Sequence, residues 1–165
     1  MVDQHQIRLQ KARSYGVDEV ARCNEAFPDS HVEKIKHWTG GQGVDVTIEA
    51  TGSPEAVKEG IAMTRDGGRF VIVGHYSDTG SVPINPHVDI NRKHLEIRGV
   101  WGCELHHFYR MIQVLDRHDG DLTDGRGWED MISHRYGLQE VNEALAAIEE
   151  GSVIKAVVEP RKDGR

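Results

Sequence analysis

The chain has 165 residues, 38% of them hydrophobic and 28% charged, a composition typical of one folded globular domain and not of a disordered chain. Its 20 basic and 27 acidic residues leave a net charge of −7, and an acidic balance without a basic stripe argues against nucleic acid as a partner. The N-terminus has no apolar signal segment and the longest strongly apolar run, residues 70–73, is too short to cross a membrane, so no membrane partner is expected either.

The first elements are predicted to be a helix and a short strand. Residues 4–15 predict a helix with Leu9 and Ala12 turned inward, and Gly16 stands where a left-handed residue commonly ends a helix. A short strand is expected over residues 19–22.

A second helix and strand follow. Residues 30–33, Ser-His-Val-Glu, have the pattern of a capping box, so the helix is predicted to begin at Ser30 and to end at the glycines 40–41. Residues 44–50 alternate polar and apolar side chains and are rich in β-branched types, which predicts a strand.

The clearest unit lies in the middle of the chain. Residues 53–54, Ser-Pro, suit the start of a helix, and the glycines 67–68 are expected to end it. Residues 69–74 contain a continuous apolar run, which is typical of a fully buried strand, and residues 95–99 predict another strand. Strands and helices joined by glycines indicate a parallel α/β sheet, which binds ligands at the carboxyl ends of its strands.

The C-terminal third is predicted to contain two helices and two strands, the strands over residues 131–135 and 153–158 with a polar loop over residues 119–127 before them. The helices are indicated by apolar stripes at Leu105, Phe108, Ile112 and Leu115, and at Val141, Ala144, Leu145 and Ile148 before Gly151.

Cysteine and histidine spacing gives no metal site. Cys23 and Cys103 are far apart and form no C-x-x-C motif, which excludes the usual zinc-binding spacings. We therefore expect no disulfide framework and a reduced cytoplasmic setting. The ten histidines are scattered, and the neighbours His106 and His107 point in different directions on a helix. No residue of this chain is therefore expected to ligate a metal.

Several blocks together resemble one family. In chain order these are residues 43–54 (GVDVTIEATGSP), 67–74 (GGRFVIVG), 84–86 (INP), 95–99 (LEIRG) and 133–155. Over residues 2–160 the chain resembles the C-terminal portion of a zinc-type medium-chain alcohol or polyol dehydrogenase, of the medium-chain dehydrogenase/reductase superfamily. The resemblance implies an incomplete Rossmann-type doubly wound parallel sheet over residues 1–101, lacking its first strand, and a segment over residues 102–165 that returns to a GroES-like catalytic domain.

The resemblance also implies cofactor-binding positions. An acidic residue at the end of the second family strand binds the adenosine ribose and repels a 2′-phosphate, so NAD is expected rather than NADP. The positions are Asp3 and Arg8 at that ribose, Ala50, Thr51 and Gly52 over the cofactor, Val73, Gly74 and His75 beside the nicotinamide, Val100, Trp101 and Gly102 at its carboxamide, and Lys155 near the pyrophosphate. Asp3, Arg8 and Lys155 could instead be ordinary surface charges, and residues 51–52 a simple turn. Glu49 is expected to be a structural, hydrogen-bonded acid rather than a general base.

Two parts of the family pattern have no match. There is no G-x-G-x-x-G fingerprint after a strand, and residues 40–43 join a helix to a strand instead. The zinc ligands of the family lie upstream of that fingerprint, so they fall outside this chain and no catalytic residue is assigned to it. Without the first strand, the strand over residues 44–50 is expected to present an open apolar edge, and the last two strands to lack partners.

The functional expectation is the cofactor-binding portion of an NAD-dependent, zinc-dependent alcohol dehydrogenase, inactive on its own. In the complete enzyme the substrate would be a small alcohol or carbonyl compound, and the chain would form a homo-oligomer or join a missing N-terminal half. The alternative is a non-catalytic Rossmann-like module that associates with another chain through its open edges. Another nucleotide-binding α/β enzyme, such as a methyltransferase, does not explain the block that ends at Lys155.

Overall fold

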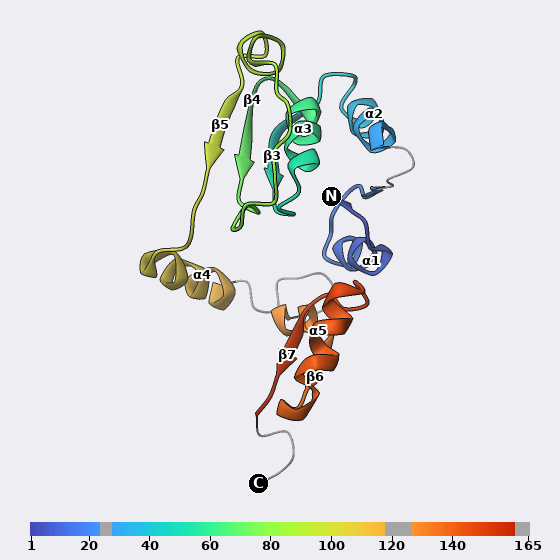
Figure 1. The fold of residues 1–165 in the computed structure, drawn as a ribbon, viewed down its shortest axis with the longest axis vertical. Coiled ribbons are helices and arrows are strands. Elements are labelled where there is room, and N and C mark those ends of the chain that lie inside the picture. The colour runs from blue at the N-terminus through green and yellow to red at the C-terminus, as the bar shows by residue number, and fades with distance from the viewer. Residues whose placement is uncertain (24–27, 118–126, 161–165) are drawn as a thin grey trace. The chain divides into compact units, whose positions relative to one another are not determined.

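The computed structural model describes residues 1–23, 28–117 and 127–160 (Figure 1). Its strands pair in parallel and are connected mainly by helices. The chain divides into two units, one of Met1–Arg22 with Leu105–Arg165 and one of Cys23–Glu104. No helix in the described part of the chain is long and apolar enough to cross a membrane. The division into a nucleotide-binding domain over residues 1–101 and a segment over residues 102–165 stays a prediction.

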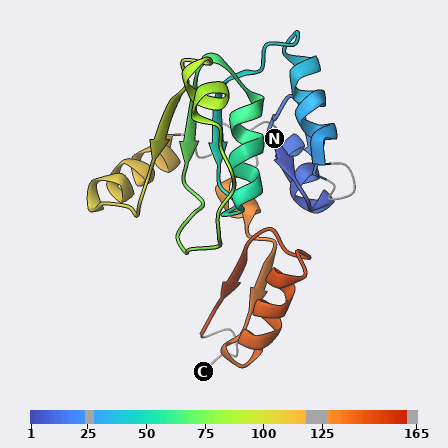
Figure 2. The same cartoon turned by 45° about the horizontal axis from the view of Figure 1, so that its top comes forward.

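The unit of residues 23–104 is built on a three-stranded parallel sheet. Its strands, in the order β3-β4-β5, are Val44–Glu49, Thr64–Ile72 and Glu96–Gly99. Its helices are α2 (Pro28–Trp38), α3 (Pro54–Met63) and a π-helical turn at Pro86–Asn91. Figures 1 and 2 both show α3 along one face of the sheet.

The core of this unit forms where α3 meets β4. Ile61, Phe70 and Leu95 are buried together, with Val57, Ile72, Ile84 and Ile90 packed around them. Gly60 brings the helix close to the strand, since a Cβ there would lie 2.4 Å from the Phe70 ring. Phe70 itself has no exposed surface.

The strand over residues 69–74 was expected to be buried throughout, which is wrong. Phe70 is buried, but Val71 and Ile72 are only half-buried. Helix α3 packs on the face of the sheet that carries Phe70, so it does not cover Val71, which lies on the opposite face. Ile72 shares the face of Phe70 but packs at the margin of the core.

Two predicted helix boundaries are also wrong. Helix α2 begins at Pro28, so Ser30 lies inside it and is not its N-cap, although Gly40 and Gly41 end it in left-handed conformation as expected. Helix α3 ends at Met63 rather than at the glycines 67–68, which lie within β4.

Lys93 binds the C-terminal end of α3. Its Nζ donates hydrogen bonds of 2.5 Å to the carbonyls of Ile61 and Thr64, which are the acceptors left open at the helix end. Burial, reinforced by the charge of Lys36, lowers the pKa of Lys93, and Asp66 and Asp89 oppose that shift.

The N-terminal part of the other unit agrees with the sequence. Helix α1 spans Gln6–Ser14 with Leu9 buried, and Gly16 after it is left-handed. Strand β1 (Val2–Asp3) pairs in parallel with β2 (Ala21–Arg22) in a sheet of their own. In the described part of the chain, β1-β2 and β3-β4-β5 therefore form separate sheets.

The C-terminal part departs from expectation in its strands. Strand β6 is His134–Tyr136, shorter than the predicted residues 131–135 because a 3₁₀ helix occupies Trp128–Met131. It pairs in parallel with β7 (Ala156–Val158), so the expectation that both strands lack partners is wrong. The predicted loop over residues 119–127 lies almost entirely outside the described residues.

The helices of this part are present, but their apolar stripes are not buried. Helix α4 spans Leu105–Arg117, with Leu105, Phe108 and Ile112 exposed. Helix α5 spans Val141–Glu149 after a 3₁₀ turn at Leu138–Glu140. Of its predicted stripe Ala144 is buried, whereas Leu145 and Ile148 are exposed.

Candidate functional site

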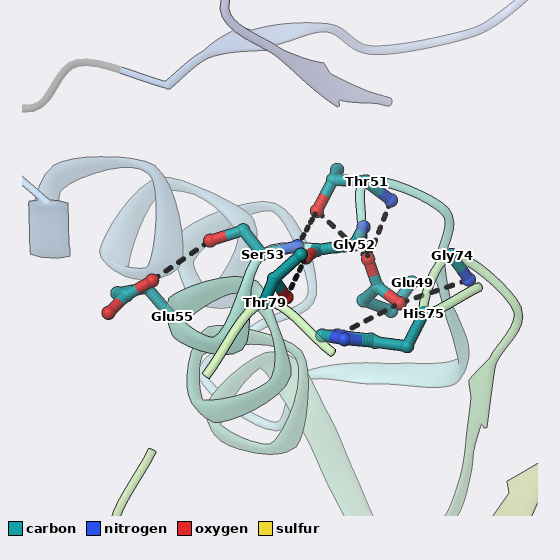
Figure 3. A network of polar contacts seen from close by, with 8 residues as sticks. All are labelled: Glu49, Thr51, Gly52, Ser53, Glu55, Gly74, His75 and Thr79. Carbon is teal, nitrogen blue, oxygen red and sulfur yellow. Dashed lines mark hydrogen bonds and ion pairs between the residues drawn. The ribbon is translucent and has the colours of Figure 1, made fainter. Parts of the chain in front are cut away.

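A buried carboxylate joins the loops that follow β3 and β4. Glu49 ends β3 and is 4% exposed. Its Oε1 accepts hydrogen bonds from the N–H groups of Thr51 at 2.6 Å and Gly52 at 2.7 Å and from the Thr51 hydroxyl at 2.9 Å. Its Oε2 accepts one from the Gly74 N–H at 3.2 Å (Figure 3). The prediction that Glu49 is a structural, hydrogen-bonded acid is confirmed.

The backbones of the two loops touch at this point. A Cβ on Gly74 would lie 2.5 Å from the Gly52 nitrogen and 2.6 Å from the Thr51 nitrogen. Gly52 has a φ of +74° and its carbonyl accepts a hydrogen bond from the Thr79 hydroxyl at 2.8 Å. Glycine is therefore required at both positions, and the carboxyl edge of the sheet is held in one conformation.

The charge of Glu49 is stabilised within this network. Burial raises the pKa of its carboxyl, but hydrogen bonds from the Gly52 N–H, the Thr51 hydroxyl and the Thr51 and Gly74 N–H groups outweigh burial and hold the pKa below its ordinary value. Glu49 is thus an anion with its lone pairs occupied by the protein, which suits a positioning role and not proton transfer.

His75 is the titratable side chain beside this carboxylate. Its Nε2 lies 3.7 Å from Glu49 Oε2, too far for a hydrogen bond, and within the described part of the chain this buried nitrogen has no hydrogen-bond partner. The rest of the side chain is partly exposed. A ligand at this edge could satisfy the ring nitrogen.

The loop after β5 adds an aromatic surface to the same unit. The Val100 N–H donates to the Ile72 carbonyl at 3.0 Å, and Gly102 is left-handed with a φ of +68°. Between them, Trp101 is 77% exposed, with its ring centroid 5.7 Å from that of Tyr76. An exposed aromatic pair offers a face on which a planar ligand can stack.

Three predicted residues lie in the other unit. Asp3 ends β1, and its Oδ1 accepts a hydrogen bond of 2.8 Å from the His5 N–H, while Oδ2 lies 3.9 Å from Arg8 Nη1. Both side chains are partly exposed, so the carboxylate keeps acceptor capacity toward a ligand. Lys155 is exposed, and the hydrogen bonds described for it are made by its backbone to Ser133 and His134.

The structure thus gathers most of the predicted positions of residues 23–104 at one sheet edge, with Ala50 exposed and Val73 donating to the Glu49 carbonyl at 2.9 Å. Sequence reasoning missed Tyr76 and Thr79. The sequence signal that could have indicated them is their position, since Tyr76 and Thr79 follow the end of β4 by a few residues.

Parallel β-α-β units with glycine contacts at the carboxyl edge define a Rossmann-type α/β protein. Residues 1–117 match the family model described as zinc-binding dehydrogenase, and the chain belongs to this family.

The sequence and the fold are also similar to those of individual dehydrogenases. The chain is 30% identical over 158 residues to 5-exo-hydroxycamphor dehydrogenase of Pseudomonas putida, covering 96% of this chain and 42% of that protein. It is 27% identical to L-threonine 3-dehydrogenase of Bacillus subtilis, covering 96% and 43%. Its fold is similar to that of an alcohol dehydrogenase from Thermotoga maritima, with a TM-score of 0.80, 26% identity and coverage of 96% and 42%. The chain spans less than half the length of the relatives it matches.

Proposed function

We propose that this chain is the cofactor-binding portion of an NAD-dependent, zinc-dependent alcohol dehydrogenase. The observation that carries the proposal is the carboxyl edge of β3 and β4, where Glu49 fixes two glycine loops against each other. A bound nicotinamide ring would accept or supply hydride. The residues of this chain would hold and orient it.

The side chains left open around this edge fit a nicotinamide. The buried His75 Nε2 has no hydrogen-bond partner among the described residues and can bind a polar group of the ligand, such as an amide or hydroxyl. Trp101 offers a stacking face, and Ala50 at the strand end is exposed. We assign residues 50–52, 73–75 and 100–102 to the nicotinamide half of the cofactor.

We assign the adenosine ribose to Asp3 and Arg8, and the pyrophosphate to Lys155. A carboxylate accepts hydrogen bonds from both ribose hydroxyls and repels a 2′-phosphate, which favours NAD over NADP. In this proposal residues 1–101 form a partial dinucleotide-binding domain, residues 102–165 return to a catalytic domain, and the substrate of the complete enzyme is a small alcohol or carbonyl compound.

The test is to measure binding of NAD⁺ and NADP⁺ to the folded chain by ligand-observed NMR at millimolar cofactor concentration. We expect saturable NAD⁺ binding that is stronger than NADP⁺ binding. Trp101→Ala should weaken NAD⁺ binding several-fold without unfolding the chain, because the side chain is 77% exposed. Asp3→Asn should narrow the preference for NAD⁺ over NADP⁺.

Val88→Ala is the control, since Val88 is also exposed in the same unit but lies outside the loops in question. A folded chain that binds neither cofactor, or a Trp101→Ala variant that binds NAD⁺ as well as the parent, contradicts the assignment. The chain alone should oxidise no alcohol with NAD⁺, because no catalytic residue is assigned to it.

A second candidate function is a non-catalytic module that associates with another chain. It is favoured by the single strand neighbour of β3 among the described strands and by the exposed Val46 and Ile48 on that strand. This function predicts a defined oligomer or heteromer and no cofactor binding, so the same binding experiment separates the two.

A further inference from the structure

Three potential metal ligands meet in the unit of residues 23–104. The Cys23 Sγ, a ring nitrogen of His31 and a carboxylate oxygen of Glu59 all lie within 4.8 Å of one another. Cys23 follows β2, His31 belongs to α2, and Glu59 belongs to α3. The cluster shares no residue with the sheet edge described above.

His31 is the most unusual member of this cluster. It is 1% exposed, yet neither ring nitrogen has a hydrogen-bond partner among the residues that the structure describes. Its Nε2 lies 3.0 Å from Glu59 Oε2, but the two atoms are not aligned as a hydrogen bond. An unsatisfied buried polar group is unfavourable, because it loses its hydrogen bonds to water without replacing them. A cation between imidazole and carboxylate would satisfy both.

We propose that Cys23, His31 and Glu59 bind a divalent metal ion of the zinc class. Thiolate, imidazole and carboxylate are the side-chain ligands that zinc takes, and three of them leave a fourth position for water. His31 is buried while Cys23 and Glu59 are partly exposed, so an ion can reach the site, and two of the three ligands carry the negative charge that it requires.

The present spacing is close to that of a loaded site. Tetrahedral zinc places its nitrogen, oxygen and sulfur ligands roughly 3.4–3.6 Å apart, from bond lengths of about 2.0–2.3 Å. The donors here lie within 4.8 Å of one another, and the His31–Glu59 pair is at 3.0 Å. Binding would therefore need a shift of about 1 Å, and it would release the thiol proton of Cys23.

The consequence would be structural. The ion would tie the residue that follows β2 to helices α2 and α3, a link that the hydrophobic core around Phe70 does not supply. The proposal does not rest on the proposed function. The usual spacing rules did not find this site because its ligands come from three separate segments.

The test is titration of the full metal-free chain with Co²⁺, which reports its ligands by absorption. We expect one Co²⁺ per chain, a thiolate-to-cobalt charge-transfer band in the near ultraviolet, displacement by Zn²⁺ and a raised melting temperature with Zn²⁺. Cys23→Ser should abolish the band, and Glu59→Gln should weaken binding by about tenfold or more.

Matched controls are available for both variants. Cys103→Ser replaces the other thiol, which is exposed, and Glu55→Gln replaces another carboxylate of α3, so both should bind Co²⁺ as the parent does. A folded chain that binds no Co²⁺, or a charge-transfer band that survives Cys23→Ser, overturns the proposal.

A second measurement needs no variant and covers the case in which Cys23→Ser fails to fold. Alkylation of the two thiols of the parent chain is followed by mass spectrometry with and without Zn²⁺. Zinc should slow the modification of Cys23 by about tenfold or more and leave Cys103 unchanged. Equal rates for Cys23 in the two conditions contradict the site.

Discussion

Glu49 shows how a single residue can shape a site without entering its chemistry. Its carboxylate accepts hydrogen bonds from Thr51, Gly52 and Gly74, and so fixes the two loops at the carboxyl edge of the sheet. An acid followed two and three residues later by Thr and Gly could be read from the sequence as a turn. The contact with Gly74 could not, because it depends on the register of two strands.

Replacing Glu49 by Gln tests this role. The amide puts a donor where Oε2 now accepts from Gly74, and it removes the charge that strengthens the other bonds. We expect Glu49→Gln to lower the free energy of unfolding by about 2–3 kcal/mol at neutral pH. Urea unfolding followed by circular dichroism measures it. Glu55→Gln is the control, since Glu55 is exposed and accepts from the Ser53 hydroxyl.

The loss should depend on pH with a definite sign. Because the pKa of Glu49 in the folded chain lies below the ordinary 4.5, the unfolded chain binds more protons in acid. The stabilisation is complete above the ordinary pKa and disappears as the pH falls through the folded-state pKa. The gap between parent and variant should thus narrow on acidification, and an unchanged gap would contradict the charged state.

The proposed metal site shows what prediction from single residues cannot find. Cys23, His31 and Glu59 could not be predicted to bind one ion, because no short spacing in the sequence connects them. Only the packing of α2 against α3 brings His31 and Glu59 together. Sites built from separate segments need tertiary structure before they can be recognised.

At the scale of elements, the existence of helices and strands was predictable and their ends were not. Periodicity identified α3 and β3 because their side chains follow the period of the structure they form, whereas α1 was indicated by Leu9 and the terminal Gly16. Ser30 and the glycines 67–68 had the residue types of helix ends. Helix α3 instead ends where Lys93, distant in sequence, reaches its carbonyls, and local residue preferences cannot show such a contact.

Burial was the least predictable property of the elements. The stripes of α4 and α5 have helical spacing, but Phe108, Ile112 and Leu145 are exposed. An apolar stripe predicts which face of a helix packs against another surface. It does not predict whether that surface belongs to the same chain.

The contact between α3 and β4 gives a prediction at this scale. Alanine is a better helix former than glycine by about 1 kcal/mol, so Gly60→Ala would stabilise an isolated helix. In the protein, the added Cβ would lie 2.4 Å from the ring of Phe70, which is fully buried and cannot move away. We expect the steric effect to win, with a net loss of about 1–3 kcal/mol.

Thermal or urea unfolding would measure this loss, with Gly99→Ala as the control, because a Cβ on Gly99 meets no atom within 4 Å. Phe70→Leu should relieve the clash, so Gly60→Ala should cost less in the Phe70→Leu background than in the parent. Equal costs in both backgrounds would show that the ring is not the obstacle.

At the scale of the whole molecule, the chain resembles parts of a larger protein. It belongs to the zinc-binding dehydrogenase family yet spans about 42% of the length of a matched relative. The first two strands and the next three form separate sheets. The sequence could not show that β6 and β7 pair with each other, since that pairing depends on what else competes for their edges.

The open face and edge of β3 lead to the last prediction. Ile48 is 64% exposed and Val46 is 49% exposed on a strand with a single neighbour in the described part of the chain. Burying such a side chain contributes about 1.5–3 kcal/mol to an interface, and an open strand edge adds backbone hydrogen bonds to a partner strand. Sedimentation velocity over a dilution series should show association of the parent, and Ile48→Lys should raise the dissociation constant about tenfold or more, because a lysine there would have to be desolvated. Val88→Lys, at a similarly exposed apolar residue outside the sheet, should leave it unchanged. If Ile48→Lys associates as tightly as the parent, the contact lies on another surface, and the exposed stripe of α4 becomes the next to test.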